Sequence, residues 1–157
     1  MTGLGDPPDP FPLQWRQGVA FEARVASAFL EHGVEAEALK KTCRPTRRDA
    51  QRYSDAGDVA ILGTRWTVEV KSRRQKFCAD PSSYPFRRVL VDSAHAVRKM
   101  GRHTDAIVIV SQLTGAMVVV PMSTRRAWFD GSIDTLDGAK LAAFVARKHL
   151  RRFCELA

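Results

Sequence analysis

Two apolar, β-branched runs on either side of Gly63-Thr64 are the feature that most constrains the fold of this chain. The runs span residues 58–62 (Asp-Val-Ala-Ile-Leu) and 65–71 (Arg-Trp-Thr-Val-Glu-Val-Lys). Such runs, joined by a two-residue turn with glycine first, predict a β-hairpin with a type II′ turn. In this hairpin Leu62 lies opposite Arg65, and that pair sets the register of both strands.

The predicted register brings three charged side chains together. Asp58 lies opposite Glu69, so the two carboxylates share a face with Cβ atoms about 4.5–5.5 Å apart. Lys71 shares that face because side chains alternate along a strand, whereas Val68 and Val70 point the other way. Opposed carboxylates destabilise a hairpin, and a bound cation such as Mg²⁺, which accepts carboxylate oxygens, relieves the repulsion. The alternative is an ordinary solvated face with two acids and a lysine, and spacing alone does not separate the two interpretations.

Length and composition indicate one globular domain. The chain has 157 residues, of which 45% are hydrophobic, enough for a core without disulfides or metals. No apolar run is long enough to cross a bilayer, and the acidic, proline-rich N-terminus lacks a secretory signal pattern, so we expect a cytoplasmic protein. The cysteines are scattered and odd in number, which argues against a disulfide framework or a zinc site: Cys43, Cys78 and Cys154.

The net charge of +8 and the pI of about 9.9 favour a polyanionic partner. Nucleic acid is preferred over an anionic membrane, because no lysine-rich amphipathic helix stands out near a terminus. Two predicted basic loops, residues 42–56 and 72–85, leave the sheet beside the paired acids and are expected to contact phosphates. Their candidate DNA-binding residues are Arg44, Arg47, Arg48, Arg52, Ser72, Arg73, Arg74 and Lys76. Ser72 is equally explained as an ordinary serine at a strand end.

The remaining pattern predicts an α/β fold, a mixed sheet flanked by helices. Residues 1–12 are a proline- and glycine-rich leader that we expect to be disordered, followed by a domain over 13–157. Apolar stripes and glycine stops predict three helices, over residues 13–32, 86–100 and 137–154. Two strands are apolar on both faces, as in the centre of a covered sheet: residues 105–112 and 116–121. Two segments are ambiguous: residues 34–41 suit a strand or a helical turn, and 122–136 are irregular or partly helical.

Glu22 adds a third carboxylate. It falls on the apolar stripe of the first predicted helix, beside Val25 and Phe29. A charge there is costly unless it is paired or bound to a metal. The alternative is a glutamate at the rim of the stripe that reaches water or pairs with Arg24 or Arg16. Taken with the hairpin acids and lysine, Glu22 completes a set that suits one or two cations.

The order of a helical Glu22, a strand Asp58 and a strand Glu69-Val70-Lys71 resembles the PD-(D/E)XK nuclease superfamily. It is similar in particular to archaeal-type Holliday-junction resolvases and related phage and restriction endonucleases. The resemblance covers roughly residues 15–121 by element order, and its specific part is four residues. Gly57 stands where the name of the motif has proline, a position that varies in the family.

This resemblance implies a restriction-endonuclease-like fold and a set of roles. Asp58 and Glu69 would bind Mg²⁺ or Mn²⁺, with the backbone carbonyl of Val70 as a further ligand. Glu22 would bind a second ion or orient a metal-bound water. Lys71 would help to activate the attacking water and stabilise the charge of the transition state. These roles suit hydrolysis of a phosphodiester, whose anionic charge demands electrostatic help.

Other acids are assigned structural roles. Asp55 is read as a turn residue, and Asp92 as the ion-pair partner of Arg88, four residues earlier on the predicted helix 86–100. The four histidines lack the spacing of a metal site.

The sequence thus predicts a Mg²⁺-dependent endodeoxyribonuclease. Nothing indicates sequence-specific reading, so we expect structure-selective cleavage of branched DNA, such as a Holliday junction or a flap, in recombination or repair. A junction has two-fold symmetry, which a homodimer would match. The alanine- and arginine-rich composition suits a bacterial or phage protein. Two alternatives remain: a non-catalytic nucleic-acid-binding module with a nuclease-like fold, and a basic subunit of a larger complex.

Overall fold

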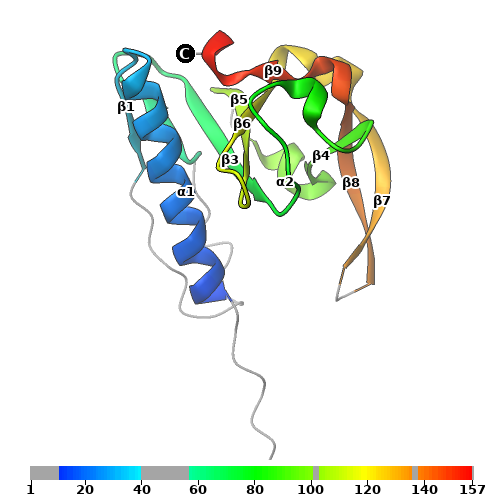
Figure 1. The fold of residues 1–157 in the computed structure, drawn as a ribbon. Helices are drawn as coiled ribbons and strands as arrows, with labels where there is room; N and C mark the ends of the chain where they lie inside the picture. The colour runs from blue at the N-terminus through cyan, green and yellow to red at the C-terminus, as the bar shows by residue number, and fades with distance from the viewer. Residues whose placement is uncertain (1–10, 40–56, 101–102, 136–137, 157) are drawn as a thin grey trace, which may run out of the picture.

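The computed structural model describes residues 11–39, 57–100, 103–135 and 138–156, with side chains from residue 16 onward. In this part of the chain a long helix, a six-stranded sheet and a three-stranded sheet lie as successive layers (Figure 1). The predicted mixed α/β class is confirmed. Residues 1–10 of the predicted leader and the whole basic loop 42–56, with Arg44, Arg47, Arg48 and Arg52, lie outside the described residues. No helix in the described ranges is long and apolar enough to span a membrane.

Helix α1 (Phe11–Glu31) corresponds to the predicted helix 13–32. Its apolar stripe, which includes Val25 and Phe29, packs against the larger sheet. The helix ends as expected at Gly33, which has a φ of 77°. The Val34 N–H donates to the Phe29 carbonyl, and the Gly33 N–H to the Leu30 carbonyl, both at 2.9 Å. This is the Schellman arrangement, which requires a left-handed residue that glycine adopts without strain.

The six-stranded sheet has a mixed order, β1-β2-β3-β5-β6-β9. Its strands are β1 (Ala36–Ala38), β2 (Val59–Ile61), β3 (Thr67–Arg73), β5 (Thr104–Ser111), β6 (Met117–Pro121) and β9 (Arg151–Arg152). Strands β3 and β5 pair in parallel, and the other described pairs are antiparallel. A parallel pair needs a long connection, and here strand β4 and helix α2 form it.

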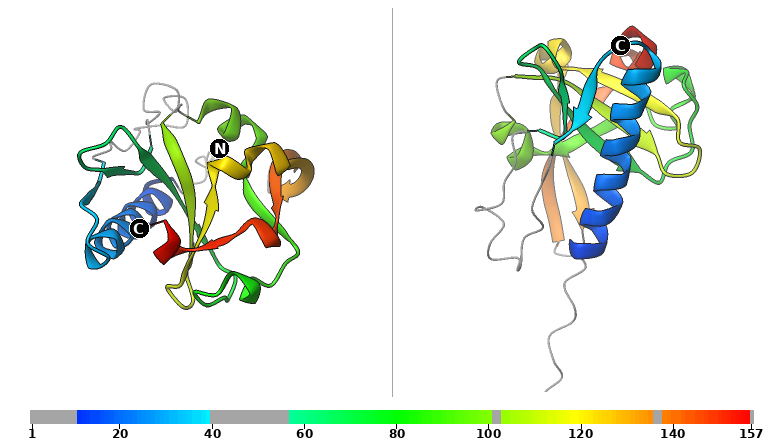
Figure 2. Two further views of the ribbon diagram at one scale, coloured as in Figure 1. Left: turned by 90° about the horizontal axis from the view of Figure 1, so that it is seen from above. Right: turned by 90° about the vertical axis from the view of Figure 1, so that its left-hand side faces the viewer.

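Strands β5 and β6 are buried on both faces, which confirms the predictions for residues 105–112 and 116–121. One face belongs to a core that we call the helix-side core, formed with α1; from β5 it receives Ala106, Val108 and Val110. The other face belongs to a second core, shared with the three-stranded sheet; from β5 it receives Ile107 and Ile109. Figure 2 shows the larger sheet lying between α1 and the smaller sheet.

The three-stranded sheet was not predicted. Its antiparallel order is β4 (Arg88–Ser93), β8 (Gly138–Ala146) and β7 (Phe129–Thr135). The predicted helix over 86–100 is wrong, because Val89 and Val91 alternate into the second core as a strand. Only its last part is helical: the Ser93 hydroxyl accepts from the Ala96 N–H at 3.1 Å and caps α2 (Ala94–Lys99).

The predicted final helix over 137–154 is also wrong. The segment forms β8, the 3-10 helix η4 (Arg147–His149), β9 and the 3-10 helix η5 (Phe153–Glu155). Strand β8 is paired on both sides, and this tertiary pairing outweighs the helical preference of its alanines and leucine. Leu141 is 51% exposed, whereas Val145 and Phe153 are buried.

Smaller differences concern three connecting segments. Residues 36–38 of the ambiguous segment 34–41 form β1. Residues 122–136 contain the 3-10 helix η3 (Met122–Ala127) and then β7. In the predicted loop 72–85, β3 continues to Arg73 and a 3-10 helix, η2 (Pro81–Ser83), follows.

Candidate functional site

The hairpin register is the predicted one for the two described pairs, Val59 with Val68 and Ala60 with Thr67. The register does not continue to the acid. The Asp58 N–H donates to the Val68 carbonyl at 3.1 Å, whereas the Asp58 carbonyl accepts from the Leu39 N–H on the β1 side. Asp58 therefore lies beside Val59 opposite Val68, as in a β-bulge, and the predicted pairing of Asp58 with Glu69 is not formed.

The turn differs in type from the prediction. The Thr64 N–H donates to the Ile61 carbonyl at 3.3 Å, which places Gly63, with a φ of 75°, at the second central position of the turn. A type II′ turn would need glycine at the first central position. The register survives because the Ile61 N–H still bonds to the Trp66 carbonyl at 3.1 Å.

Asp58 is held against β3. Its side chain is buried, at 5% exposure, and its Oδ2 accepts a hydrogen bond from the Val70 N–H at 2.5 Å. The N–H and C=O of one strand residue point to the same side. The carbonyl of Val70 therefore faces the side of β3 on which Asp58 lies, as its predicted role as a ligand requires.

Gly57 occupies a backbone conformation that the proline of the motif name cannot adopt. Its φ is 127°, whereas proline fixes φ near −65°. A Cβ at this position would lie 2.8 Å from the Thr67 Oγ1. The departure from the motif at Gly57 therefore has a local steric reason.

Lys71 lies between two carboxylates. Its Nζ is 3.3 Å from Glu69 Oε1 and 2.6 Å from Asp92 Oδ2, and all three side chains are about four-fifths buried. Burial alone would lower the pKa of Lys71, but the negative charges of Glu69, Asp92 and Asp58 outweigh it and raise that pKa. Three carboxylates thus act on one ammonium group, which is protonated at neutral pH.

Asp92 is a member of this site that the sequence did not reveal. The β4–β8 register shifts between Leu90 and Asp92, a β-bulge of the kind that redirects a side chain near functional sites. The Ser93 N–H donates to Asp92 Oδ1 at 2.7 Å and fixes the carboxylate further. The predicted helical pair with Arg88 is wrong, because both residues lie on a strand. The alternation of Val89 and Val91 was the available signal for that strand.

Glu22 stays a prediction as a member of the site. It is buried, at 8% exposure, on α1, which packs on the helix-side core. Glu69 pairs in register with Ile107, whose side chain belongs to the second core. The side chain of Glu69 therefore leaves the sheet on the face opposite to the one that α1 covers. In the described part of the chain no three His, Cys, Asp or Glu side chains form a group arranged to hold a metal ion.

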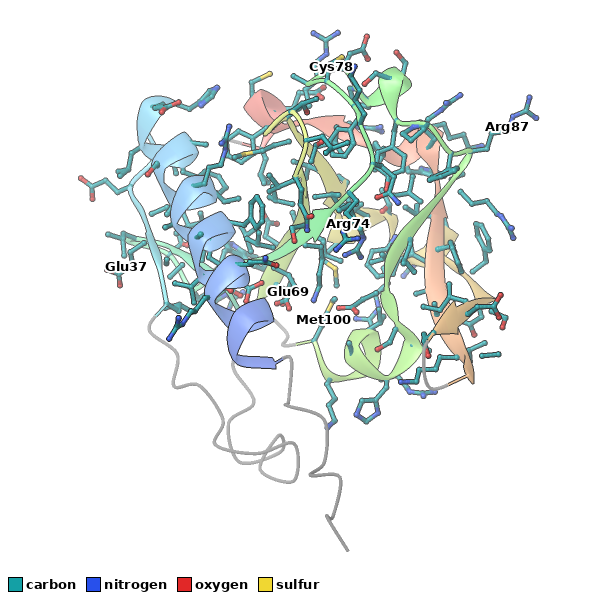
Figure 3. The ribbon with its side chains drawn as sticks, turned by 60° about the horizontal axis from the view of Figure 1, so that its bottom comes forward. Glu37, Glu69, Arg74, Cys78, Arg87 and Met100 are labelled. Carbon is teal, nitrogen blue, oxygen red and sulfur yellow. The ribbon has the colours of Figure 1, made fainter. Side chains whose placement is uncertain are left out.

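The second predicted basic loop, residues 72–85, contains both exposed residues and residues held by hydrogen bonds within the protein. Arg74 and Lys76 are exposed, as phosphate contacts require. Ser72 accepts a hydrogen bond at its hydroxyl from Gln112 Nε2 at 3.0 Å, which gives it a structural role at the end of β3. Figure 3 shows Arg74 and Glu69 on the same part of the molecule, with Glu37 apart from them toward one edge.

The structure thus brings Glu69 and Asp92 into contact with Lys71, and holds Asp58 against Val70 on the same strand. Comparison of the chain with protein-family models, curated proteins and solved structures gives no match. The chemistry of the site therefore rests on the geometry of these four side chains.

Proposed function

We propose that this chain is a metal-dependent DNA endonuclease of the PD-(D/E)XK type. The observation that carries the proposal is the convergence of Asp58, Glu69 and Asp92 on Lys71. Clustered carboxylates beside a backbone carbonyl are the hard oxygen donors that Mg²⁺ and Mn²⁺ accept. A lysine held among them is a fixed positive charge beside the place where a phosphate would react.

The donor set fits one divalent cation. Asp58, Glu69 and the Val70 carbonyl would hold it, because the Val70 contact already ties the Asp58 carboxylate to this point of β3. When bound, the cation would lower the pKa of a water ligand and polarise the scissile phosphate. Glu22 remains the candidate for a second ion or for orienting that water.

Lys71 and Asp92 have complementary roles in this proposal. The ammonium of Lys71 stabilises the negative charge that develops on the phosphoryl oxygens and helps to position the attacking water. Asp92 is a positioning residue, because its short contact with Lys71 Nζ holds the ammonium from the β4 side. Placement of this kind costs no reorganisation when the reaction occurs.

The polyanionic substrate is inferred from charge. The net charge of +8 and the exposed Arg74 and Lys76 beside the site favour a nucleic-acid backbone. Contacts of this type position DNA without reading its sequence. We therefore propose structure-selective cleavage of branched DNA, and a homodimer where the branch is two-fold symmetric.

Incubation with Mg²⁺ and labelled linear, flapped and four-way DNAs tests this function. We expect the wild-type chain to nick one branched form, and Lys71→Ala to bind that DNA without cutting it. Lys99→Ala, which removes an exposed lysine from α2, is the matched control and is expected to cut normally. Equal cleavage by Lys71→Ala, with its melting temperature unchanged, would exclude the proposed site.

Calorimetry separates the enzyme from the alternative, a nucleic-acid-binding module without catalysis. An enzyme of this type binds Mg²⁺ or Mn²⁺, and Asp58→Asn is expected to abolish that binding. A binding module would ignore the ion and keep a DNA affinity that falls steeply with salt.

Asp92→Asn is expected to lower the cleavage rate about tenfold, because Lys71 loses one of the two carboxylates that form ion pairs with it. Single-turnover kinetics at saturating Mg²⁺ measure the effect, and DNA affinity should not weaken because no positive charge is lost. Asp130→Asn, an exposed aspartate on β7 of the same sheet, is the control. An unchanged rate in Asp92→Asn would show that Lys71 does not depend on Asp92.

A further inference from the structure

A cavity of about 390 Å³ lies next to the acidic site, between the end of β3 and the three-stranded sheet. Its volume falls in the range of about 300–1,000 Å³ that is typical of small-molecule sites. The residues that give it chemical character are cationic, aromatic or amide-bearing: Arg73, Gln75, Phe86, Arg87, Arg88 and Phe144. None of the roles proposed above uses this cavity.

Two buried polar atoms of residues that line the cavity have no hydrogen-bond partner among the described residues. The Arg73 guanidinium is pinned by the Val91 and Ser72 carbonyls, each at 3.1 Å, yet its buried Nε–H stays unpaired. The buried Oε1 of Gln75 is unpaired as well. Unpaired buried polar groups are costly. Because both atoms are shielded from solvent, contacts with a ligand fall to the exposed residues of the lining, Phe86, Arg87 and Arg88.

The cavity also has an aromatic wall of the kind on which bases stack. Phe86 is 53% exposed although it is a large apolar side chain. The Arg88 guanidinium lies 5.6 Å from the centroid of the Phe144 ring. Aromatic faces combined with arginine form the usual platform for unpaired nucleobases.

The cavity lies close to the acidic site along β3. Arg73, which lines the cavity, lies two residues beyond Lys71 on β3 and therefore on the same face of that strand. Two residues along a strand span about 6.8 Å, or about two nucleotides of a stacked DNA strand.

Positive charge continues beyond the cavity. A second cavity, of about 610 Å³, shares Arg87 with the first and adds Arg147 and Lys148. Arg87 is exposed on the far side of the molecule from Glu37 in Figure 3. A DNA strand leaving the acidic site would therefore meet cations along its phosphates.

We propose that the 390 Å³ cavity receives one unpaired nucleobase adjacent to the scissile phosphate. This inference rests on the proposed nuclease function and narrows its substrate to DNA with an unpaired nucleotide at the branch. The base stacks on the exposed ring of Phe86, and the guanidinium groups of Arg87 and Arg88 lie beside it. Every base has an aromatic face that is free to stack once it is unpaired, so the cavity recognises the unpaired state and not a sequence.

The test uses a duplex with one unpaired 2-aminopurine, a fluorescent base, and the same duplex fully paired, both without divalent ions so that no cleavage occurs. We expect the wild-type chain to quench the unpaired base and to prefer that duplex. Phe86→Ala is expected to reduce the preference about tenfold, as loss of one stacking contact implies. Arg126→Ala, an exposed arginine outside the cavity lining, should preserve it.

Two results would overturn the inference: equal affinity for the two duplexes, or an unchanged preference in Phe86→Ala. Because Phe86 is exposed, this variant is expected to fold, and a thermal melt verifies it. A parallel assay with Mg²⁺ distinguishes the two proposals. Quenching without cleavage supports the base cavity and contradicts the nuclease, whereas cleavage without quenching contradicts only the base cavity.

Discussion

Glu69→Gln is expected to lower the rate of Mg²⁺-dependent cleavage by about a hundredfold or more. Glu69 precedes Val70, whose N–H holds the Asp58 carboxylate, and contacts Lys71 at 3.3 Å, so in the proposed site it serves both the cation and the lysine. Loss of its charge weakens a metal site that contributes several kcal/mol to the transition state, and each 1.36 kcal/mol is tenfold in rate. Glutamine keeps the shape of the side chain, so the free energy of unfolding should change little.

Glu37→Gln is the matched control for Glu69→Gln. Glu37 is an exposed glutamate on β1, the edge strand of the same sheet, and pairs with Ala60 two strands from Glu69. Its replacement should leave cleavage, metal binding and DNA affinity unchanged. A Glu69→Gln chain that cuts as fast as the wild type, or a Glu37→Gln chain that loses activity to the same extent, would contradict the assignment of the acidic site.

Phe29→Ala is expected to destabilise the fold by about 3–5 kcal/mol. Phe29 is 1% exposed in the helix-side core, and its ring lies 4.8 Å from that of Phe153 near the C-terminus. Truncation leaves a cavity where α1, the larger sheet and η5 meet, and the surrounding backbone cannot collapse fully into it. Urea denaturation followed by circular dichroism measures the change.

Leu30→Ala is the control for Phe29→Ala, because the neighbouring Leu30 is 55% exposed on the same helix. Its effect should stay within about 0.5 kcal/mol, as for most surface positions. Equal destabilisation by the two substitutions would mean that α1 does not bury the face on which Phe29 lies.

The acidic site draws on both sheets. Glu69 and Lys71 come from β3 of the six-stranded sheet and Asp58 directly precedes its neighbour β2, whereas Asp92 comes from the three-stranded sheet. The Arg73 guanidinium links the same two layers through the Val91 carbonyl. In this arrangement the second sheet completes the surroundings of Lys71 and forms one wall of the cavity proposed for a base.

The hairpin of β2 and β3 has features that the sequence predicts and one that it does not. The register of β2 and β3 was predictable because the period of two along each strand, and the short reversal at residues 62–65, leave few ways to pair them. The turn type was wrong, since glycine at position 63 suits a left-handed residue at either central position of a turn. The end of α1 at Gly33 was predicted correctly, because a glycine that follows an apolar helical stripe commonly adopts the left-handed conformation that ends a helix.

The sequence by itself determined the elements whose pattern is local: α1 and its stop at Gly33, the register of β2 and β3, and the two-faced burial of β5 and β6. The tertiary structure alone decided that residues 88–93 and 138–146 are strands and that Asp92 turns toward Lys71. The physical reason is the separation along the chain of the residues that make the stabilising contacts. A hairpin or a helix cap is formed by neighbours in the chain, whereas β4 and β8 are held by hydrogen bonds to each other across some fifty residues, and the bulge at Asp92 exists only within that pairing.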